Sequence, residues 1–177
     1  MNYHNITYPD MNNGDGLRVV LWLSGCSHHC YNCQNPQTWD VNSGIPFDES
    51  AKEELFRELD KDYISGLTLS GGDPLHEANL DGVLDLVNEI RLSFPNKSIW
   101  IYSGYQWSEI FNDGVYLTKN CYGWKRREIV RQCTVMVDGR YIDSQRNPSK
   151  KWAGSDNQRV LDIQQSLQKG EIVLWKC

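Results

Sequence analysis

Apolar residues in this chain fall into short continuous runs, and the segments between the runs have helical periodicity. The runs predict buried strands at residues 17–23, 67–69, 98–102, 134–137, 160–163 and 172–174. Apolar residues that recur every three to four positions predict helices at 51–60, 78–93 and 125–132, and a shorter one near 107–111. Residues 1–13 are polar and show no periodicity, so we expect no regular element there.

Four of the apolar runs end in the same way, with a small polar residue followed by glycine. These endings are Ser24-Gly25, Ser70-Gly71, Ser103-Gly104 and Asp138-Gly139. Helical segments separate most of these runs, and the order strand, helix, strand predicts a parallel sheet with right-handed crossovers. Because the carboxyl ends of parallel strands lie at one edge, where ligands bind, the four endings are expected to share that edge.

Three of the six cysteines lie in the loop after the first predicted strand, at Cys26, Cys30 and Cys33. An iron–sulfur cluster held by three thiolates would keep one iron open to a further ligand, and this is the interpretation that the spacing favours. A zinc site is an alternative, in which His28 or His29 supplies the fourth ligand. A disulfide is a poor use of three close thiols in a reducing compartment.

Length, charge and cysteine usage narrow the class of protein. The 177 residues predict one domain, covering 1–177. A net charge of -5 lacks the excess of positive charge that is typical of nucleic-acid binding. No apolar run predicts a signal segment or a membrane span. The uneven placement of the cysteines argues against a secreted disulfide framework, so we expect a cytoplasmic protein. Cys121, Cys133 and Cys177 receive no role from the sequence.

Two motifs together resemble the radical S-adenosylmethionine (SAM) superfamily: Cys26-x3-Cys30-x2-Cys33 and Gly71-Gly72-Asp73-Pro74. Further strings make the chain similar to the activating proteins of anaerobic ribonucleoside-triphosphate reductases, over about Met1 to Arg159. These strings are Gly16–Val20, Ser24–Cys26, Thr38–Trp39, Leu69–Leu75, Val137–Gly139 and Gly154–Arg159. The last of them, Gly154–Arg159, has no role that we can derive from its residues.

The resemblance implies a 4Fe-4S cluster on Cys26, Cys30 and Cys33, with SAM bound at the open iron. An electron from the reduced cluster cleaves SAM into methionine and a 5′-deoxyadenosyl radical, which takes a hydrogen atom from a glycine of the reductase. The partner is thus an anaerobic ribonucleoside-triphosphate reductase. No cysteine-rich insert for extra clusters is present, so the resemblance also implies an external one-electron donor such as a flavodoxin.

The resemblance also suggests which residues contact SAM. Gly71, Gly72 and Asp73 offer acceptors to the methionine ammonium group. Asn32, Cys33 and Gln34 lie where relatives contact the adenosine part, and Ser103 is a further candidate at the same edge. No catalytic residue is expected beyond the cluster and SAM, because the cofactor carries the difficult chemistry.

For the fold, we expect an α/β protein built as an incomplete (β/α) barrel, open on one side, with five or six mostly parallel strands. Such a gap would admit a glycine-bearing loop of the reductase. Two alternatives remain open at this point. One is another small radical SAM enzyme of the deazaguanine synthase type, acting on a small molecule, and the other is a zinc-stabilised interaction module without catalysis.

Overall fold

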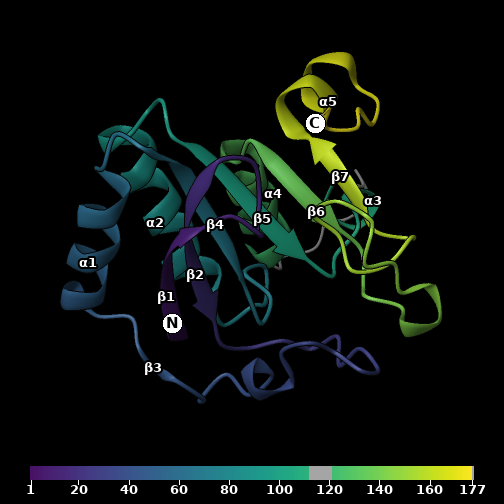
Figure 1. Ribbon diagram of the computed structural model, residues 1–177, viewed down its shortest axis with the longest axis horizontal. Coiled ribbons are helices and arrows are strands. Elements are labelled where there is room, and N and C mark those ends of the chain that lie inside the picture. Colours follow the sequence, from purple (N-terminus) through teal and green to yellow (C-terminus); the bar gives the residue numbers. More distant parts are fainter. Residues whose placement is uncertain (112–120, 177) are drawn as a thin grey trace.

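A single seven-stranded sheet organises the computed structural model, which describes residues 1–111 and 121–176 (Figure 1). The strand order is β3-β1-β2-β4-β5-β6-β7. The strands are β1 (Asn2–Asp10), β2 (Leu17–Leu23), β3 (Ile45–Pro46), β4 (Ile64–Gly71), β5 (Ser98–Ser103), β6 (Val135–Asp138) and β7 (Arg159–Asp162). The helices are α1 (Glu49–Leu59), α2 (Leu80–Ser93), α3 (Trp107–Phe111), α4 (Cys121–Gln132) and α5 (Ile163–Lys169).

The parallel centre of the sheet agrees with the predicted order of elements. Strands β2, β4, β5 and β6 are mutually parallel, and α1, α2 and the pair α3–α4 connect them in turn. The helices pack on one face, where Leu21, Leu69 and Ile101 of the sheet meet Leu55 of α1 and Val87 of α2 in a single apolar cluster. All five side chains are fully buried, and this burial is the main force that holds the helices to the sheet.

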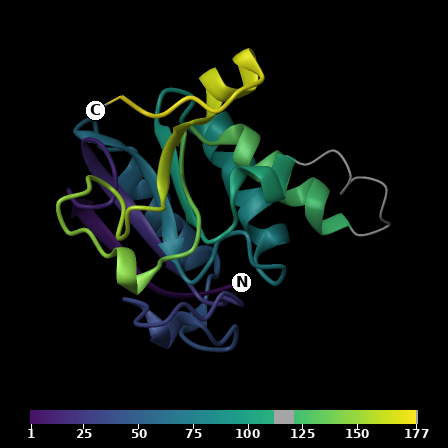
Figure 2. The same ribbon diagram turned by 90° about the vertical axis from the view of Figure 1, so that its right-hand side faces the viewer.

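The opposite face of the sheet carries polar and aromatic side chains beside aliphatic ones such as Val20 and Val137. Because side chains alternate along a strand, Thr68 and Trp100 point away from the helices. The ring of Trp100 packs edge-on against Trp152 and Trp175, at centroid distances of 5.6 and 5.8 Å. A long loop between β6 and β7, rather than helices, therefore covers part of this second face, and Figure 2 shows it across the sheet from α2 and α4.

The expected α/β class and unclosed sheet are confirmed, but the expectation of mostly parallel strands was wrong, and the barrel shape is not confirmed. The sheet is open and mixed: three strand pairs are parallel, whereas β1–β2, β1–β3 and β6–β7 are antiparallel. The reversal between β1 and β2 follows from their short connection, since a hairpin can join only antiparallel strands. A parallel core with antiparallel strands at both edges results, and seven strands replace the expected five or six.

The first strand, β1, was not predicted at all, because a bulge hides its periodicity. Its two buried apolar residues, Tyr3 and Ile6, are three positions apart. The register against β2 shifts between Tyr3 and Asn5, so the strand changes phase and both side chains reach the core. Pairing with β2 and β3 outweighs the polar composition of this segment.

The remaining predicted elements are confirmed with shifted ends, except one. The expected strand at 172–174 is only an isolated bridge between Leu174 and Leu161. Asp48 caps α1 by accepting a hydrogen bond from the backbone N–H of Ala51.

Within the described residues, no helix has the length and apolar character that crossing a membrane requires.

Candidate functional site

The cysteine loop after β2 is anchored at its start by backbone hydrogen bonds. The amide of Gly25 donates to the carbonyl of Thr38 at 2.7 Å, and the amide of Cys26 donates to that of Trp39 at 3.0 Å. The side-chain amide of Asn79, at the start of α2, donates to the carbonyl of Ser24 at 2.7 Å. These bonds close the loop on itself and tie it to α2, so the backbone that carries the thiol of Cys26 is held in place.

The glycine-rich turn after β4 lies directly against this loop. The amide of Gly72 donates to the carbonyl of Leu23, and the amide of Asp73 donates to that of Gly25, both at 2.7 Å. A Cβ on Gly72 would lie 2.4 Å from the oxygen of Gly25, a distance that no real Cβ adopts. Glycine is therefore required here because two backbones come into contact.

The carboxylate of Asp73 joins three strand ends. It accepts hydrogen bonds from the hydroxyl of Ser103 at 2.9 and 3.0 Å, and from the amides of Gly104 at 2.9 Å and Leu75 at 2.8 Å. The ring nitrogen Nε2 of His28 lies 2.7 Å from the oxygen Oδ2, which Gly104 also contacts. A buried carboxylate must have such partners, and here they come from the ends of β2, β4 and β5.

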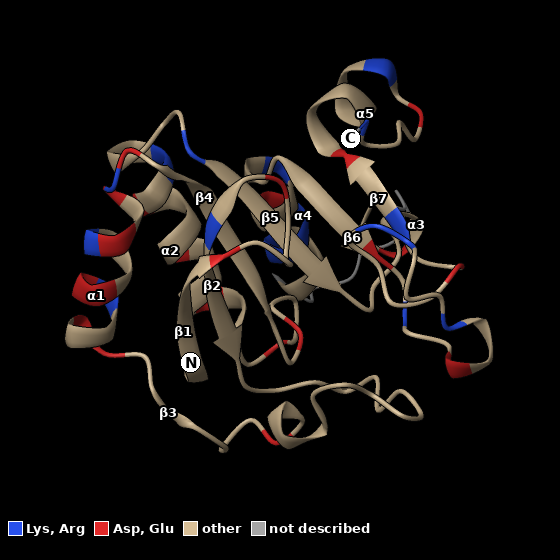
Figure 3. Ribbon diagram, viewed as in Figure 1, with Lys and Arg blue, Asp and Glu red and all other residues tan. Residues whose placement is uncertain are grey.

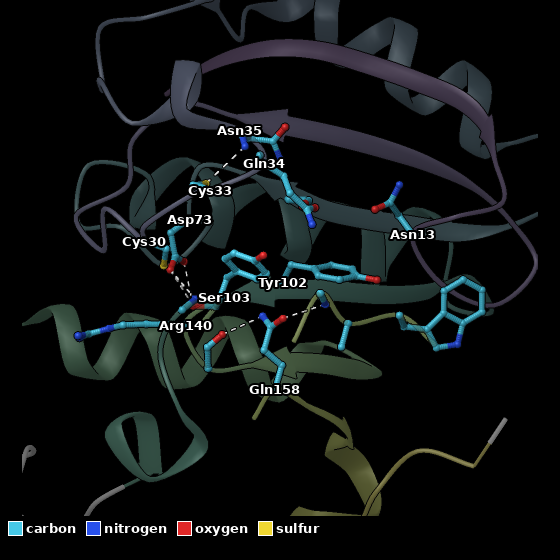
Figure 4. A pocket seen from close by; sticks show the side chains of 18 of the residues that line it. Asn13, Cys30, Cys33, Gln34, Asn35, Asp73, Tyr102, Ser103, Arg140 and Gln158 are labelled. Atoms are coloured by element: carbon cyan, nitrogen blue, oxygen red, sulfur yellow. Dashed lines mark hydrogen bonds between the residues drawn. The ribbon is translucent and has the colours of Figure 1, made fainter. Parts of the chain in front are cut away.

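One cavity of about 530 Å³ is lined by the predicted site residues, with the exception of Asn32. Its lining includes Cys26, Cys30, Cys33, Gln34, Gly71, Gly72, Asp73 and Ser103. In Figure 4, Cys30, Asp73 and Ser103 gather at one end of the cavity, whereas Asn13 lies at the other. Asn32 does not line the cavity; it is exposed, and its side-chain amide donates to Asp143 at 3.2 Å.

All three thiols of the loop are free and partly buried. Burial raises the pKa of Cys26 to about 11 and also raises the pKa of Cys30. The thiolate, rather than the thiol, binds metal, so loading this site with iron must release protons. The donor set of three soft sulfur atoms in one cavity fits an iron–sulfur cluster.

The histidines do not complete a zinc site. Both ring nitrogens of His28 are engaged, Nε2 with Asp73 and Nδ1 as the acceptor of a hydrogen bond from Arg140 at 3.1 Å. The ring of His29 packs on Trp39. Across residues 1–111 and 121–176, no three His, Cys, Asp or Glu side chains converge on a point where one ion could bind.

Sequence reasoning missed the second wall of the cavity, which the β6–β7 loop supplies. Residues of that loop that line the cavity include Arg140, Tyr141, Trp152, Gly154 and Gln158. The unassigned string Gly154–Arg159 builds this wall. The side-chain oxygen of Gln158 accepts from the amides of Gly154 and Ser155, at 2.9 and 3.2 Å, and its nitrogen donates to the carbonyl of Gly139 at 2.9 Å.

The string ends in a paired charge at the same edge of the sheet. The guanidinium of Arg159 donates to both oxygens of Asp138, at 3.0 and 2.5 Å. The sequence alone assigned the string Gly154–Arg159 no role, and the fold shows that it shapes the loop.

Cys133 is fully buried just before β6 begins, away from the carboxyl ends of the strands. Cys121 starts α4, and Cys177 lies outside the described residues.

Comparison with known proteins agrees with this geometry. The family described as "4Fe-4S single cluster domain" matches residues 12–161. The chain is 38% identical over 162 residues to the anaerobic ribonucleoside-triphosphate reductase-activating protein of Escherichia coli (strain K12), covering 90% of this chain and 97% of the relative. The protein of the same name from Enterobacteria phage T4 is 40% identical over 161 residues, covering 90% and 93%.

The chain belongs to the family of anaerobic ribonucleoside-triphosphate reductase-activating proteins. The family match over residues 12–161 includes both the cysteine loop and the β6–β7 loop. Membership of this family makes the chain an activating enzyme with an iron–sulfur domain.

Proposed function

We propose that this protein activates an anaerobic ribonucleoside-triphosphate reductase, using a 4Fe-4S cluster on Cys26, Cys30 and Cys33 and SAM bound beside it. The observation that carries the proposal is the meeting of the three thiols with the Gly71–Asp73 turn in one cavity. The relatives with this name, at 38–40% identity, support it. When bound, the cluster and SAM supply a carbon-centred radical that takes a hydrogen atom from a glycine of the reductase.

The residues of the chain have to position SAM and protect the reaction. The turn at Gly71 and Gly72 brings bare backbone to the cavity, where it can meet the ammonium group of SAM. The carboxylate of Asp73 already accepts hydrogen bonds from four residues, so we assign it the task of holding that turn in place. Ser103 belongs to the same brace. Cys33 and Gln34 line the side assigned to the adenosine part, and exposed Asn32 can contribute through its backbone.

The electron for each cycle comes, in this proposal, from an external one-electron donor such as a flavodoxin. Among the described residues, one group of thiols lines the cavity, that of Cys26, Cys30 and Cys33. Cys133 is fully buried and is not part of the cavity lining. We infer that the chain holds one cluster, so it needs a partner to deliver electrons.

The test mixes the anaerobically reconstituted and reduced protein with SAM and the anaerobic reductase of the same organism. Electron paramagnetic resonance (EPR) should then detect a glycyl radical on the reductase. Cys30→Ala should abolish the signal, whereas Cys133→Ala, which alters a cysteine outside the cavity, should retain it. A reductase that stays without radical, although the wild-type protein holds its cluster and SAM is consumed, would contradict the proposed substrate.

A further inference from the structure

His28 sits inside the cysteine motif, yet it faces the sheet. Its side chain is only 5% exposed, and its ring packs edge-on against Tyr105 at a centroid distance of 4.7 Å. Gly104 makes the room, because a Cβ there would lie 2.3 Å from the ring of His28. The ring is therefore held in one orientation between Asp73 and the surface of the loop.

The hydrogen bonds of His28 determine its tautomer. Arginine can only donate, so Nδ1 of His28, which lies 3.1 Å from Nε of Arg140, must be the acceptor. The ring hydrogen is then on Nε2, where it is donated to Asp73 at 2.7 Å. A neutral ring satisfies both neighbours, and its fixed position directs the guanidinium of Arg140 along the cysteine loop.

The backbone of Arg140 is held as firmly as its side chain. The side chain of Asn157 donates to the carbonyl of Arg140 at 2.8 Å, and that of Gln158 donates to the carbonyl of Gly139 at 2.9 Å. Figure 3 shows Lys and Arg along the loop between β6 and β7, to which Arg140 belongs. Among the described residues, no carboxylate forms an ion pair with Arg140, so its charge is not neutralised locally.

The charge of Arg140 lies beside the cysteine loop. Arg140 lines the same cavity as Cys26, Cys30 and Cys33, and its hydrogen bond to His28 holds its side chain against the stretch between Cys26 and Cys30. The guanidinium therefore brings a positive charge to the place where the cluster would bind. A reduced cluster carries one more negative charge than an oxidised one, and nearby charge and hydrogen bonds are known to set cluster potentials.

We propose that Arg140 tunes the cluster and that His28 is the positioning residue that holds it: the guanidinium, fixed through His28 to Asp73, raises the reduction potential of a cluster on Cys26, Cys30 and Cys33. The proposal rests on the cluster assignment of the proposed function. It explains why the β6–β7 loop, whose string Gly154–Arg159 shapes it, reaches across to the cysteine motif.

The experiment is a redox titration of the full-length, anaerobically reconstituted protein, followed by the EPR signal of the reduced cluster. Arg140→Gln removes the charge and should lower the equilibrium constant of reduction by about three- to fivefold, the size expected for an exposed charge. Arg140→Lys keeps the charge and should recover most of that loss. Arg146→Gln is the matched control, because this arginine lies in the same loop, lines the cavity, and forms no side-chain hydrogen bond to the cysteine loop among the described residues.

A double-mutant cycle of His28→Ala and Arg140→Gln tests the positioning role of His28. If His28 acts by holding Arg140, it should shift the potential in the wild-type background but add little in the Arg140→Gln background. An unchanged potential in Arg140→Gln, or an equal shift in Arg146→Gln, overturns the proposal. A wild-type protein that binds no iron–sulfur cluster would instead overturn the proposed function, so the two failures are distinguishable.

Discussion

His28 and Asp73 are 45 residues apart in the chain, yet the ring nitrogen Nε2 of one lies 2.7 Å from the carboxylate oxygen Oδ2 of the other. Both side chains are almost completely buried, at 5% and 2% exposure. This contact joins the cysteine motif to the glycine-rich turn, which are separate in the sequence. The two motifs therefore form one structural unit, and a substitution in either motif should disturb the structure of the other.

Replacing a thiol of the loop should remove the cluster without unfolding the protein. For Cys33→Ala, we expect iron binding to fall by more than the roughly 10- to 100-fold that a change next to a metal ligand costs. Cys33 is only partly buried, so the fold should tolerate the change. Iron and sulfide content after anaerobic reconstitution measures the effect, with Cys133→Ala as the control. Equal iron content in wild type and Cys33→Ala would sink the ligand assignment.

The carboxylate of Asp73 should contribute strongly to stability. Asp73→Asn replaces one acceptor oxygen with a donor that faces the donors of Ser103, Gly104 and His28. We expect a loss of about 2 to 4 kcal/mol in the free energy of unfolding, because a buried charged hydrogen-bond network is broken. Urea unfolding of the protein without cluster measures it.

Ser103→Ala is the matched comparison for that change. It removes one donor to the carboxylate and the acceptor of the Tyr105 amide, but leaves the carboxylate with its other partners, so about 1 kcal/mol should be lost. If Asp73→Asn proved no more destabilising than Ser103→Ala, Asp73 would not be the centre of the network.

The close approach at Gly72 predicts a steric penalty. In Gly72→Ala, the new Cβ would meet the backbone oxygen of Gly25 at 2.4 Å, so the turn and the cysteine loop must separate. We expect a loss of about 1 to 3 kcal/mol and SAM binding weakened by roughly tenfold or more, as measured by unfolding and by calorimetric titration.

Gly170 provides the control for glycine replacement. It has a left-handed backbone, with φ of 71°, and no atom lies within 4 Å of the position that a Cβ would take there. Gly170→Ala should therefore cost only about 1 kcal/mol of backbone strain and leave SAM binding unchanged. Equal effects on SAM binding in both variants would show that the contact at Gly72 is not what matters.

Buried Cys133 should make stability depend on alkaline pH. Burial raises the pKa of its thiol to about 12, from an ordinary value of 9.0. The folded protein thus holds this proton more tightly than the unfolded chain, so the contribution is complete below about pH 9 and is lost as the pH rises towards about 12. The loss approaches about 1.4 kcal/mol per pH unit within that window.

Comparison with Cys133→Ala isolates this contribution from the other groups that titrate at high pH. The variant is less stable at pH 7 because the buried sulfur leaves a gap, but its stability should fall less steeply above about pH 9. Urea unfolding of both proteins in the cluster-free state at several pH values gives the two slopes. Parallel slopes would contradict a buried, neutral thiol.

Local patterns were sufficient for the centre of the fold but not for its edges. The four strand endings in Ser-Gly or Asp-Gly are confirmed at the carboxyl ends of four parallel strands. The strand β1 escaped prediction because the bulge between Tyr3 and Asn5 breaks its alternation. The antiparallel edges, where mostly parallel strands were expected, depend on pairing between segments and not on the composition of any one of them.

The amino-acid sequence by itself determined the elements of the parallel core, the three thiols in one loop and the turn beside them, because spacing and periodicity are local properties of the chain. Only the tertiary structure decided what surrounds them. The partners of His28 are 45 and 112 residues away, and the β6–β7 loop closes the cavity from across the sheet. Hydrogen bonds between such distant groups exist only after the sheet has brought its strand ends together, so no spacing along the chain could have predicted them.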